Sequence, residues 1–499
     1  MRKKKLLKNT IASITFEVTT LICGFILPRL ILRYYGSQVN GLVNSITQFL
    51  QIIALFDMGV GAVVQSTLYK PLAEKDNVLI SKIVKSAKRF FDLLGIALLI
   101  YIAILVCVYP SLINDQFSWL YTVMLICAMG ISSFSQYYFG VVERLLLTAD
   151  QRGYIQYNAQ TIVLIMNTLA CVLLIRSGMS IQIVKLATSC IYLLRPLYLH
   201  IYVNKQYSID RKIQYNEEPI KQKKNGIAQH LASVVLNNTD VVVLTIFSTL
   251  SNVSIYSVYN MVVYGVKQLF TSSTTGVQAV LGELWAKKQY AQLQSFFNKI
   301  EWLMHTAITI VFGCTAILIT SFVMVYTHGV TDVNYYQPLF AVLITMAHAS
   351  HCLRLPYNIM ILAGGHYKQT QKNYIIAALL NIIISILFVR KFGLIGVAIG
   401  TLIAMLYQTI WMAYYDSQNF IKRPMGIFVK QICIDLLIVI IASLISSYIS
   451  IEVLNYFEWT KLAIKVFLIW LSVSICVNLL FYNKQMINLF LLFKKIRIK

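Results

Sequence analysis

Residues 346–365, MAHASHCLRLPYNIMILAGG, place two histidines and an arginine in a segment that is otherwise apolar. His348, His351, Arg354 and Asn358 recur every three or four residues, which puts them on one face of a helix. A guanidinium inside an apolar helix costs several kcal/mol in lipid unless it is paired or faces water. Because its planar fork matches phosphate and carboxylate oxygens, Arg354 indicates either a site for an anionic ligand or one half of a buried ion pair.

The two histidines of this segment stand three residues apart, a spacing that could serve a metal ion. No third ligand is apparent in the sequence. We therefore predict no metal site, and we expect His348 and His351 to line a cavity or to pack.

A second polar stripe follows one face of the apolar segment 254–282. Such a face is costly against lipid, so it should line a watery cavity or pair inside a helix bundle. A stripe of hydroxyl residues alone can instead serve helix packing. The stripe consists of Tyr256, Asn260, Tyr264, Lys267 and Thr271.

Three carboxylates also lie inside apolar segments: Glu17, Asp57 and Asp240. They are matched in number by the intramembrane cations Arg195, Lys267 and Arg354. Two interpretations stay open. The carboxylates pair with the cations, or they carry a coupling proton or sodium ion.

The elements that must position these residues are membrane helices. Hydrophobic residues form 58% of the chain and charged residues 12%, about half the charged fraction of a soluble domain. Apolar runs of the length that crosses a bilayer recur throughout, and we expect the basic start to lead directly into the first span, without a cleaved leader. The sequence predicts an all-α polytopic membrane protein with about fourteen spans, at 8–33, 41–69, 90–110, 118–142, 154–176, 181–203, 226–248, 254–282, 301–326, 336–364, 371–390, 394–415, 428–451 and 461–483.

The charges between the spans predict the topology. Most of the 43 Lys and Arg residues fall in the segments that share one side with the N-terminus. By the positive-inside rule this side is cytoplasmic, and an even number of spans puts both termini there. The net charge of +24 is thus a consequence of topology and of contact with anionic lipid, and we expect no nucleic-acid partner.

The nine cysteines are scattered among the predicted spans without a CxxC pair, so we expect them to be small packing residues.

Two short patterns recur at nearly one offset. LTADQRGYIQYN at 147–158 aligns with LAGGHYKQTQKN at 362–373, and the Gly-Val-x-Ala-Val of 59–63 recurs at 276–280. They predict a duplication of six spans, with the copies parallel and a cavity between them. We predict four parts: a six-helix lobe at 1–203, a charged cytoplasmic linker at 204–225, a second six-helix lobe at 226–415, and an extra helix pair with a basic tail at 416–499.

The chain has no Walker-type phosphate loop, no outer loop large enough for a polymerase site, and no convincing nucleophile–base or metal-ligand arrangement in its loops. These observations disfavour an enzyme, including a membrane polymerase or ligase, and we expect no cofactor. The polar stripes count against a purely structural scaffold. Transport is the remaining interpretation.

Four segments carry a resemblance to a known family. LPRLILRYYGSQVNGL, FDMGVGAVVQSTLYKPLAEKD, LLLTADQRGYIQYN and ILAGGHYKQTQKNY resemble bacterial polysaccharide-unit flippases. These belong to the multidrug/oligosaccharidyl-lipid/polysaccharide exporter superfamily. The resemblance covers about residues 1–480 and rests on layout and diffuse patterns, because the family has no short invariant motif.

The resemblance implies two lobes and an extra helix pair that move undecaprenyl-pyrophosphate-linked oligosaccharide units to the outer leaflet by alternating access. Such export serves capsule, exopolysaccharide or O-antigen assembly at the bacterial cytoplasmic membrane. It implies membrane lipids as surroundings, and a polymerase and glycosyltransferases as partners. In this family cavity cations hold the lipid pyrophosphate. The residues of this chain that fit a substrate site are Arg354, Lys267, Arg195 and His351 as polar or cationic groups, Tyr256 and Tyr264 against sugar faces, and Asn260 and Asn358 against sugar hydroxyls.

A cation-coupled multidrug exporter of the same superfamily is the alternative. An exporter of cationic drugs favours an acidic cavity. The equal numbers of intramembrane cations and carboxylates weaken this alternative.

Overall fold

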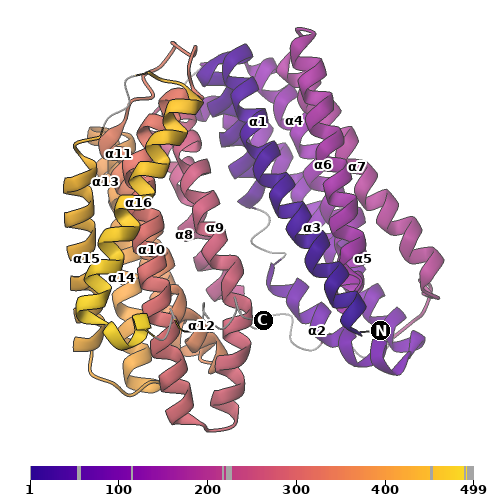
Figure 1. Ribbon diagram of the computed structural model, residues 1–499. Helices are drawn as coiled ribbons and strands as arrows, with labels where there is room; N and C mark the ends of the chain where they lie inside the picture. Colours follow the sequence, from indigo (N-terminus) through magenta and orange to yellow (C-terminus); the bar gives the residue numbers. More distant parts are fainter. Residues whose placement is uncertain are drawn as a thin grey trace. The chain divides into compact units, whose positions relative to one another are not determined.

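The computed structural model describes residues 2–52, 58–113, 116–215, 219–220, 227–449, 453–487 and 491. These residues are almost entirely helical, and they contain no strand. Two compact units divide the chain, residues 1–254 and 255–499. Figure 1 shows the helices of both units as long rods. The helices of the first unit are α1 (Arg2–Gln51), α2 (Met58–Glu74), α3 (Asn77–Leu112), α4 (Trp119–Ser135), the π-helix η2 (Gln136–Gly140), α5 (Val141–Ala149), α6 (Gly153–Arg176), α7 (Ile181–Gln206) and α8 (Ile227–Phe247).

The second unit contains the remaining helices, and α9 begins just before its boundary. They are α9 (Leu250–Ala286), α10 (Tyr290–Tyr326), α11 (Pro338–Leu353), α12 (Leu355–Ala363), α13 (Tyr367–Phe392), α14 (Leu394–Asn419), α15 (Gly426–Ser446) and α16 (Tyr456–Phe481).

The predicted all-α membrane fold is confirmed. Among the described residues, eleven helical stretches are long and apolar enough to cross a membrane. Each of the fourteen predicted spans has a helical counterpart, and several counterparts consist of two pieces. The predicted span 336–364 is α11 followed by α12. The predicted span 41–69 includes the end of α1 and most of α2, and its residues 53–57 lie outside the described residues.

The first unit reverses direction inside α1 at Gly36, whose backbone is non-helical (φ 82°, ψ 175°). A positive φ of this kind is open to glycine and strained for other residues. Tyr35 beside it donates its hydroxyl hydrogen to the Met179 carbonyl at 2.5 Å. The bend therefore lies at the end of the unit where α6 and α7 are joined.

At the other end of the first unit, the start of the 204–225 segment is held by hydrogen bonds. Asp210 N–H donates to Ser81 Oγ at 3.0 Å, and Lys85 Nζ donates to the Ile213 carbonyl at 2.6 Å. Tyr207 donates to Asp150 Oδ2 at 2.6 Å. Burial, together with this bond to a carboxylate, raises the pKa of the Tyr207 hydroxyl, which stays a donor. Part of the predicted linker is thus fixed to the unit, and much of the rest lies outside the described residues.

The second unit is built around α10. This helix packs against α11 and against both members of the C-terminal pair, α15 and α16. Its Gly313 faces Trp470 of α16 so closely that a methyl group there would overlap the indole ring. On the other side α11 packs against α14, which pairs closely with α13.

The two units do not divide where the sequence analysis places the lobes. The described contacts group α8, which packs against α1, with the first unit. The sequence analysis assigned α8 to a second lobe at 226–415. The four-part division of the chain stays a prediction.

Candidate functional site

The site begins at a break between two helices of the second unit. α11 ends at Leu353 and α12 starts at Leu355, with Arg354 between them. Pro356 stands in the first turn of α12 and has no N–H. The backbone hydrogen bonds of α11 therefore cannot continue into α12 without a gap. The backbone of Arg354 itself keeps helical dihedral angles (φ −73°, ψ −23°). The break is therefore a local interruption of the hydrogen-bond ladder, and it lies at the charged residue.

Arg354 is buried, with a relative exposure of 3%. Its Nη2 donates to Nδ1 of His351 at 2.9 Å. Because Nδ1 accepts this bond, its proton is absent and the ring hydrogen of His351 is on Nε2. Among the described residues, Nε and Nη1 of Arg354 have no hydrogen-bond partner, and no carboxylate pairs with the guanidinium. An orphaned buried donor of this kind calls for an explanation, and a ligand is one.

Lys267 of α9 brings a second cation to this region. Its side chain is buried, and its Nζ lies 4.9 Å from the ring centroid of Tyr264. Lys267 lies near enough to Arg354, His348 and His351 for their charges to interact. We call these four residues the cation cluster, after its two cations Lys267 and Arg354. It comprises Lys267, His348, His351 and Arg354, all within the second unit.

A cluster of apolar side chains packs next to the cation cluster. Phe312 of α10, Cys352 of α11 and Leu355 of α12 form its buried core, and Val266 and Phe270 of α9 pack against it. The rings of Phe270 and Phe312 stack with centroids 5.9 Å apart. This packing fixes α9 and the α11–α12 break relative to α10, so the cations come from braced elements.

Asn358 lies one turn beyond Arg354, and its Oδ1 accepts a hydrogen bond from the Tyr374 hydroxyl of α13 at 2.7 Å. Tyr374 also lies close enough to Arg354 for an electrostatic interaction. The sequence analysis did not select Tyr374. Only its place in KNYIIAALLN, directly after the polar end of α13, could have suggested it.

The tyrosines of the α9 stripe have different surroundings. Tyr256 is buried and its ring lies 5.9 Å from that of Phe340. Tyr264 is 51% exposed, and Asn260 is half-buried. The stripe is therefore buried at its start and open near the cation cluster.

The other predicted residues belong to the first unit. Arg195 of α7 is half-buried. With the Gln160 amide oriented so that its oxygen faces Arg195, this oxygen accepts from Nη1 at 3.0 Å and from Nη2 at 3.2 Å. Asp240 of α8 is buried. Glu17 is exposed on α1 and forms no ion pair with a described residue. Asp57 lies outside the described residues.

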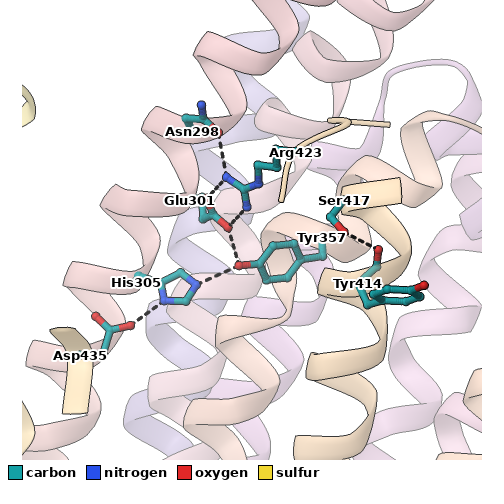
Figure 2. Close-up of polar contacts among 8 residues, drawn as sticks. All are labelled: Asn298, Glu301, His305, Tyr357, Tyr414, Ser417, Arg423 and Asp435. Atoms are coloured by element: carbon teal, nitrogen blue, oxygen red, sulfur yellow. Dashed lines mark hydrogen bonds and ion pairs between the residues drawn. The ribbon is translucent and has the colours of Figure 1, made fainter. Parts of the chain in front are cut away.

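A second polar cluster of the second unit was missed by the sequence analysis, which gave none of its members a functional role. Figure 2 shows it as a chain of contacts from Arg423 to Asp435. Nη1 of Arg423 donates to Glu301 Oε2 at 2.6 Å, and Nη2 donates to Oε1. Glu301 also accepts from the Tyr357 hydroxyl at 2.6 Å. We call the chain Arg423–Glu301–Tyr357–His305–Asp435 the buried polar chain.

The charged and histidine members escaped notice because each stands near the end of an apolar segment or in a loop, and Tyr357 is an ordinary tyrosine inside one. Glu301 and His305 lie in NKIEWLMHT, and Arg423 lies in the hydrophilic NFIKRP, where charges are expected. Among the described residues, no group of three or more His, Cys, Asp or Glu side chains could hold a metal ion.

The comparisons with known proteins are informative at the level of structure. No family model matches the sequence, and no curated protein matches it. Among solved structures, the fold is similar to that of the lipid II flippase MurJ in an inward closed conformation, with a TM-score of 0.71 and 16% identity. That likeness covers 95% of this chain and 99% of the flippase.

Two further structures extend the comparison. A multidrug resistance MATE family transporter of the MOP superfamily, in its inward-facing conformation, gives a TM-score of 0.62 at 14% identity, covering 80% of this chain and 95% of the transporter. A MOP superfamily transporter from Pyrococcus furiosus gives 0.54 at 13% identity, covering 85% and 97%. At such identities the likeness concerns the fold. The chain shares the fold of these solved transporters, and the fold that the sequence resemblance implies is confirmed.

Proposed function

We propose that this protein is a flippase that moves undecaprenyl-pyrophosphate-linked oligosaccharide units from the inner to the outer leaflet by alternating access. The fold supports a transporter of lipid-linked or amphipathic substrates, because a lipid II flippase and multidrug transporters share it. The substrate and its pathway of capsule, exopolysaccharide or O-antigen assembly are our inference from the cation cluster and from the sequence resemblance.

The observation that carries this proposal is the state of Arg354. A buried guanidinium with two unpartnered nitrogens and no described carboxylate partner has donors and charge available for an anion. A pyrophosphate supplies several oxygens and negative charge, and Arg binds such groups through two parallel hydrogen bonds. In a site of low dielectric, one such cation has a far stronger effect than at the surface.

The remaining parts of the site suit a glycan and a lipid tail. The half-exposed ring of Tyr264 next to Lys267 offers a face for a sugar, and Asn260 and Asn358 offer amides for hydroxyl groups. The prenyl tail can stay in the bilayer throughout, so only the charged head and the sugars need a polar path. Arg195 is the candidate for a further contact in the first unit.

Several finer points belong to the same proposal. We place the protein in the bacterial cytoplasmic membrane with both termini inside, working next to a polymerase and glycosyltransferases of its pathway. Transport is coupled to H⁺ or Na⁺, with Glu17, Asp57 and Asp240 as candidate carriers. The protein transports its substrate unchanged and needs no cofactor.

The test is binding of a prenyl diphosphate to the purified protein in nanodiscs. Wild type should bind the diphosphate more tightly than the monophosphate, and the monophosphate more tightly than the prenyl alcohol. Arg354→Ala should weaken diphosphate binding by roughly tenfold or more, because a charge-assisted hydrogen bond contributes about 1.5–3 kcal/mol. Arg354→Lys should keep part of the affinity, since it keeps the charge and loses the fork.

Lys461→Ala is the matched control, because Lys461 is an exposed cation of the second unit that pairs with Glu458. It should leave diphosphate binding unchanged. Unchanged affinity in a well-folded Arg354→Ala protein would remove Arg354 from the substrate site. Tight binding of organic cations, with no preference for the diphosphate, would support the multidrug exporter instead.

A further inference from the structure

The buried polar chain connects four parts of the second unit through short contacts. Nδ1 of His305 lies 2.6 Å from Asp435 Oδ2, and Nε2 lies 3.2 Å from the Tyr357 oxygen. Tyr357 in turn donates to Glu301. Glu301 and His305 belong to α10, Tyr357 to α12 and Asp435 to α15, while Arg423 belongs to the segment between α14 and α15 (Figure 2). His305 is fully buried, with 0% exposure.

Counting hydrogens shows that this chain needs one more proton than its groups supply. The contacts Asp435–His305, His305–Tyr357 and Tyr357–Glu301 each require one hydrogen. Glu301 is ionised, because it accepts two hydrogen bonds from Arg423, and the Tyr357 hydrogen serves Glu301. A neutral imidazole carries a single hydrogen. With Asp435 ionised, one of the two contacts of His305 would then bring lone pairs face to face.

Charge balance favours the same extra proton. Asp435 and Glu301 bring two negative charges, and Arg423 brings one positive charge. A proton on the Asp435–His305 pair makes the buried chain neutral, and its loss leaves an uncompensated buried charge, which is costly.

The neighbouring groups do not reverse this balance. Asp416 of α14 lies near Arg423 and Glu301, and its ionisation would make the surroundings more negative. On α15, Gln431 donates to Asp435 Oδ1 at 3.2 Å and is neutral. Tyr482, after α16, lies near Asp435, and the exposed Lys430 lies over its ring at 5.5 Å. Lys430 is exposed, so water screens its charge.

We propose that the Asp435–His305 pair is a proton-binding site, and that its bound proton fastens α12 to α10 and α15. Tyr357 is the link: its hydroxyl accepts from His305 only when the ring hydrogen is available at Nε2. Tyr357 stands three residues after Arg354, on the short helix that begins at the Arg354 break. The proton thereby also fixes the position of Arg354, and this last consequence rests on the proposed function.

Asp435→Asn tests the site, because an amide brings its own hydrogen. The N–H of the new amide can donate to Nδ1 of His305, and the ring hydrogen then serves Tyr357 without an extra proton. The unfolding equilibrium of the full-length protein should be followed in detergent between pH 6 and pH 9. Native wild type holds one proton that the unfolded chain has released, so its stability relative to Asp435→Asn should fall as pH rises. A single linked proton changes the ratio of the two unfolding constants by about tenfold per pH unit.

Tyr357→Phe is the second variant, for the case that Asp435→Asn does not fold. Without the hydroxyl, the single ring hydrogen can serve Asp435 at Nδ1, so the contacts no longer require the extra proton. Charge balance alone then favours it, and the pH slope should be smaller than in wild type. In ¹⁵N spectra of histidine-labelled wild type, with His305→Gln used for assignment, Nε2 of His305 should carry a proton at pH 7. Equal pH slopes in wild type and both variants, or an unprotonated Nε2, would overturn the proton site.

The link to Arg354 has a separate readout. Prenyl diphosphate affinity should fall with rising pH in wild type more than in Asp435→Asn. A proton-linked stability slope with no such difference in affinity would retain the proton site and overturn its connection to Arg354. Loss of diphosphate binding at every pH in both proteins would count against the proposed function, and the stability slope would be unaffected.

Discussion

Two buried arginines of the second unit differ in what surrounds them. Arg423 has a bidentate carboxylate partner in Glu301 and a further acceptor in Asn298 at 2.8 Å. Arg354 has one described partner, Nδ1 of His351, and two of its own guanidinium nitrogens have none. The same side chain thus serves structure in one place and is available to a ligand in the other.

This difference predicts opposite effects of removal on stability. Arg423→Ala leaves Glu301 as an uncompensated buried charge and should lower the free energy of unfolding by about 3–5 kcal/mol. Arg354→Ala removes an unpaired buried charge, so stability should stay equal or rise. The measurement is unfolding of each purified variant in the same detergent. Adding Glu301→Gln to Arg423→Ala should recover part of the loss; a strong loss in Arg354→Ala would mean that Arg354 has a structural partner.

At this scale the sequence was a partial guide. Arg354 could be found because it interrupts an apolar run, where a charge is conspicuous. Arg423 could not, because it stands in a loop where charges are ordinary, and its burial depends on Glu301, more than a hundred positions earlier in the chain. Tyr374 and His305 acquire their partners only through the packing of separate helices, which no spacing in the sequence encodes.

At the scale of helices, close approach depends on small residues. α10 and α16 meet at Gly313, where the buried Trp470 ring occupies the space that a side chain would need. The apolar period predicted both helices. It did not predict their contact, because a glycine in an apolar run looks the same wherever it faces.

Gly313→Ala should therefore destabilise the protein by roughly 1–3 kcal/mol, the usual cost of overpacking. The indole ring is rigid and enclosed, so it must move as a whole. Gly276→Ala is the matched control, since Gly276 is also inside a helix of the second unit and has nothing within 4 Å of the added methyl group. Thermal unfolding of both variants measures the difference. A Gly313→Ala protein as stable as Gly276→Ala would show that α16 can shift without cost.

Helix breaks were the hardest elements to predict. The spans 41–69 and 336–364 were expected as single helices because their hydropathy is continuous. The structure interrupts the second between α11 and α12, where Pro356 was the local signal. Residues 53–57 of the first span lie outside the described residues. Gly36 allows α1 to reverse direction where the sequence analysis expected a short outer loop. Hydropathy reports burial in lipid and is insensitive to the backbone dihedral angles that redirect a chain.

At the scale of the whole molecule, each unit has two ends that the contacts define. In the first unit, the segments after α5 and α7 meet through Asp150 and Tyr207, while Met179 lies at the opposite end beside Tyr35. In the second, the segment before α13 and the segment after α14 meet through His366 and Phe420. The other end holds the α15–α16 connection.

The final prediction assigns these ends to the two sides of the membrane. In each unit basic residues concentrate at one end, formed by the segment after α7 in the first unit and by the segment after α14 in the second, so both of these ends should be cytoplasmic. Ser177 precedes α7 and Ser208 follows it. Gln418, in the last turn of α14, precedes α15, and Ser447 follows it. All four are exposed. In a background with the nine native cysteines replaced, Ser208→Cys and Gln418→Cys should react with an impermeant maleimide only in inverted vesicles. Ser177→Cys and Ser447→Cys should react only in intact cells.

The four sites test the helix count and the orientation separately, because each pair brackets one spanning helix. The background protein without an introduced cysteine must stay unlabelled in both preparations. If all four sites react on the reverse sides, the orientation is wrong and the alternation of helices stands. If both members of one pair react on the same side, that helix does not cross, and the even number of spans fails. Under the proposed function, the basic end is also the side from which the lipid-linked substrate should be loaded, because that substrate is made inside.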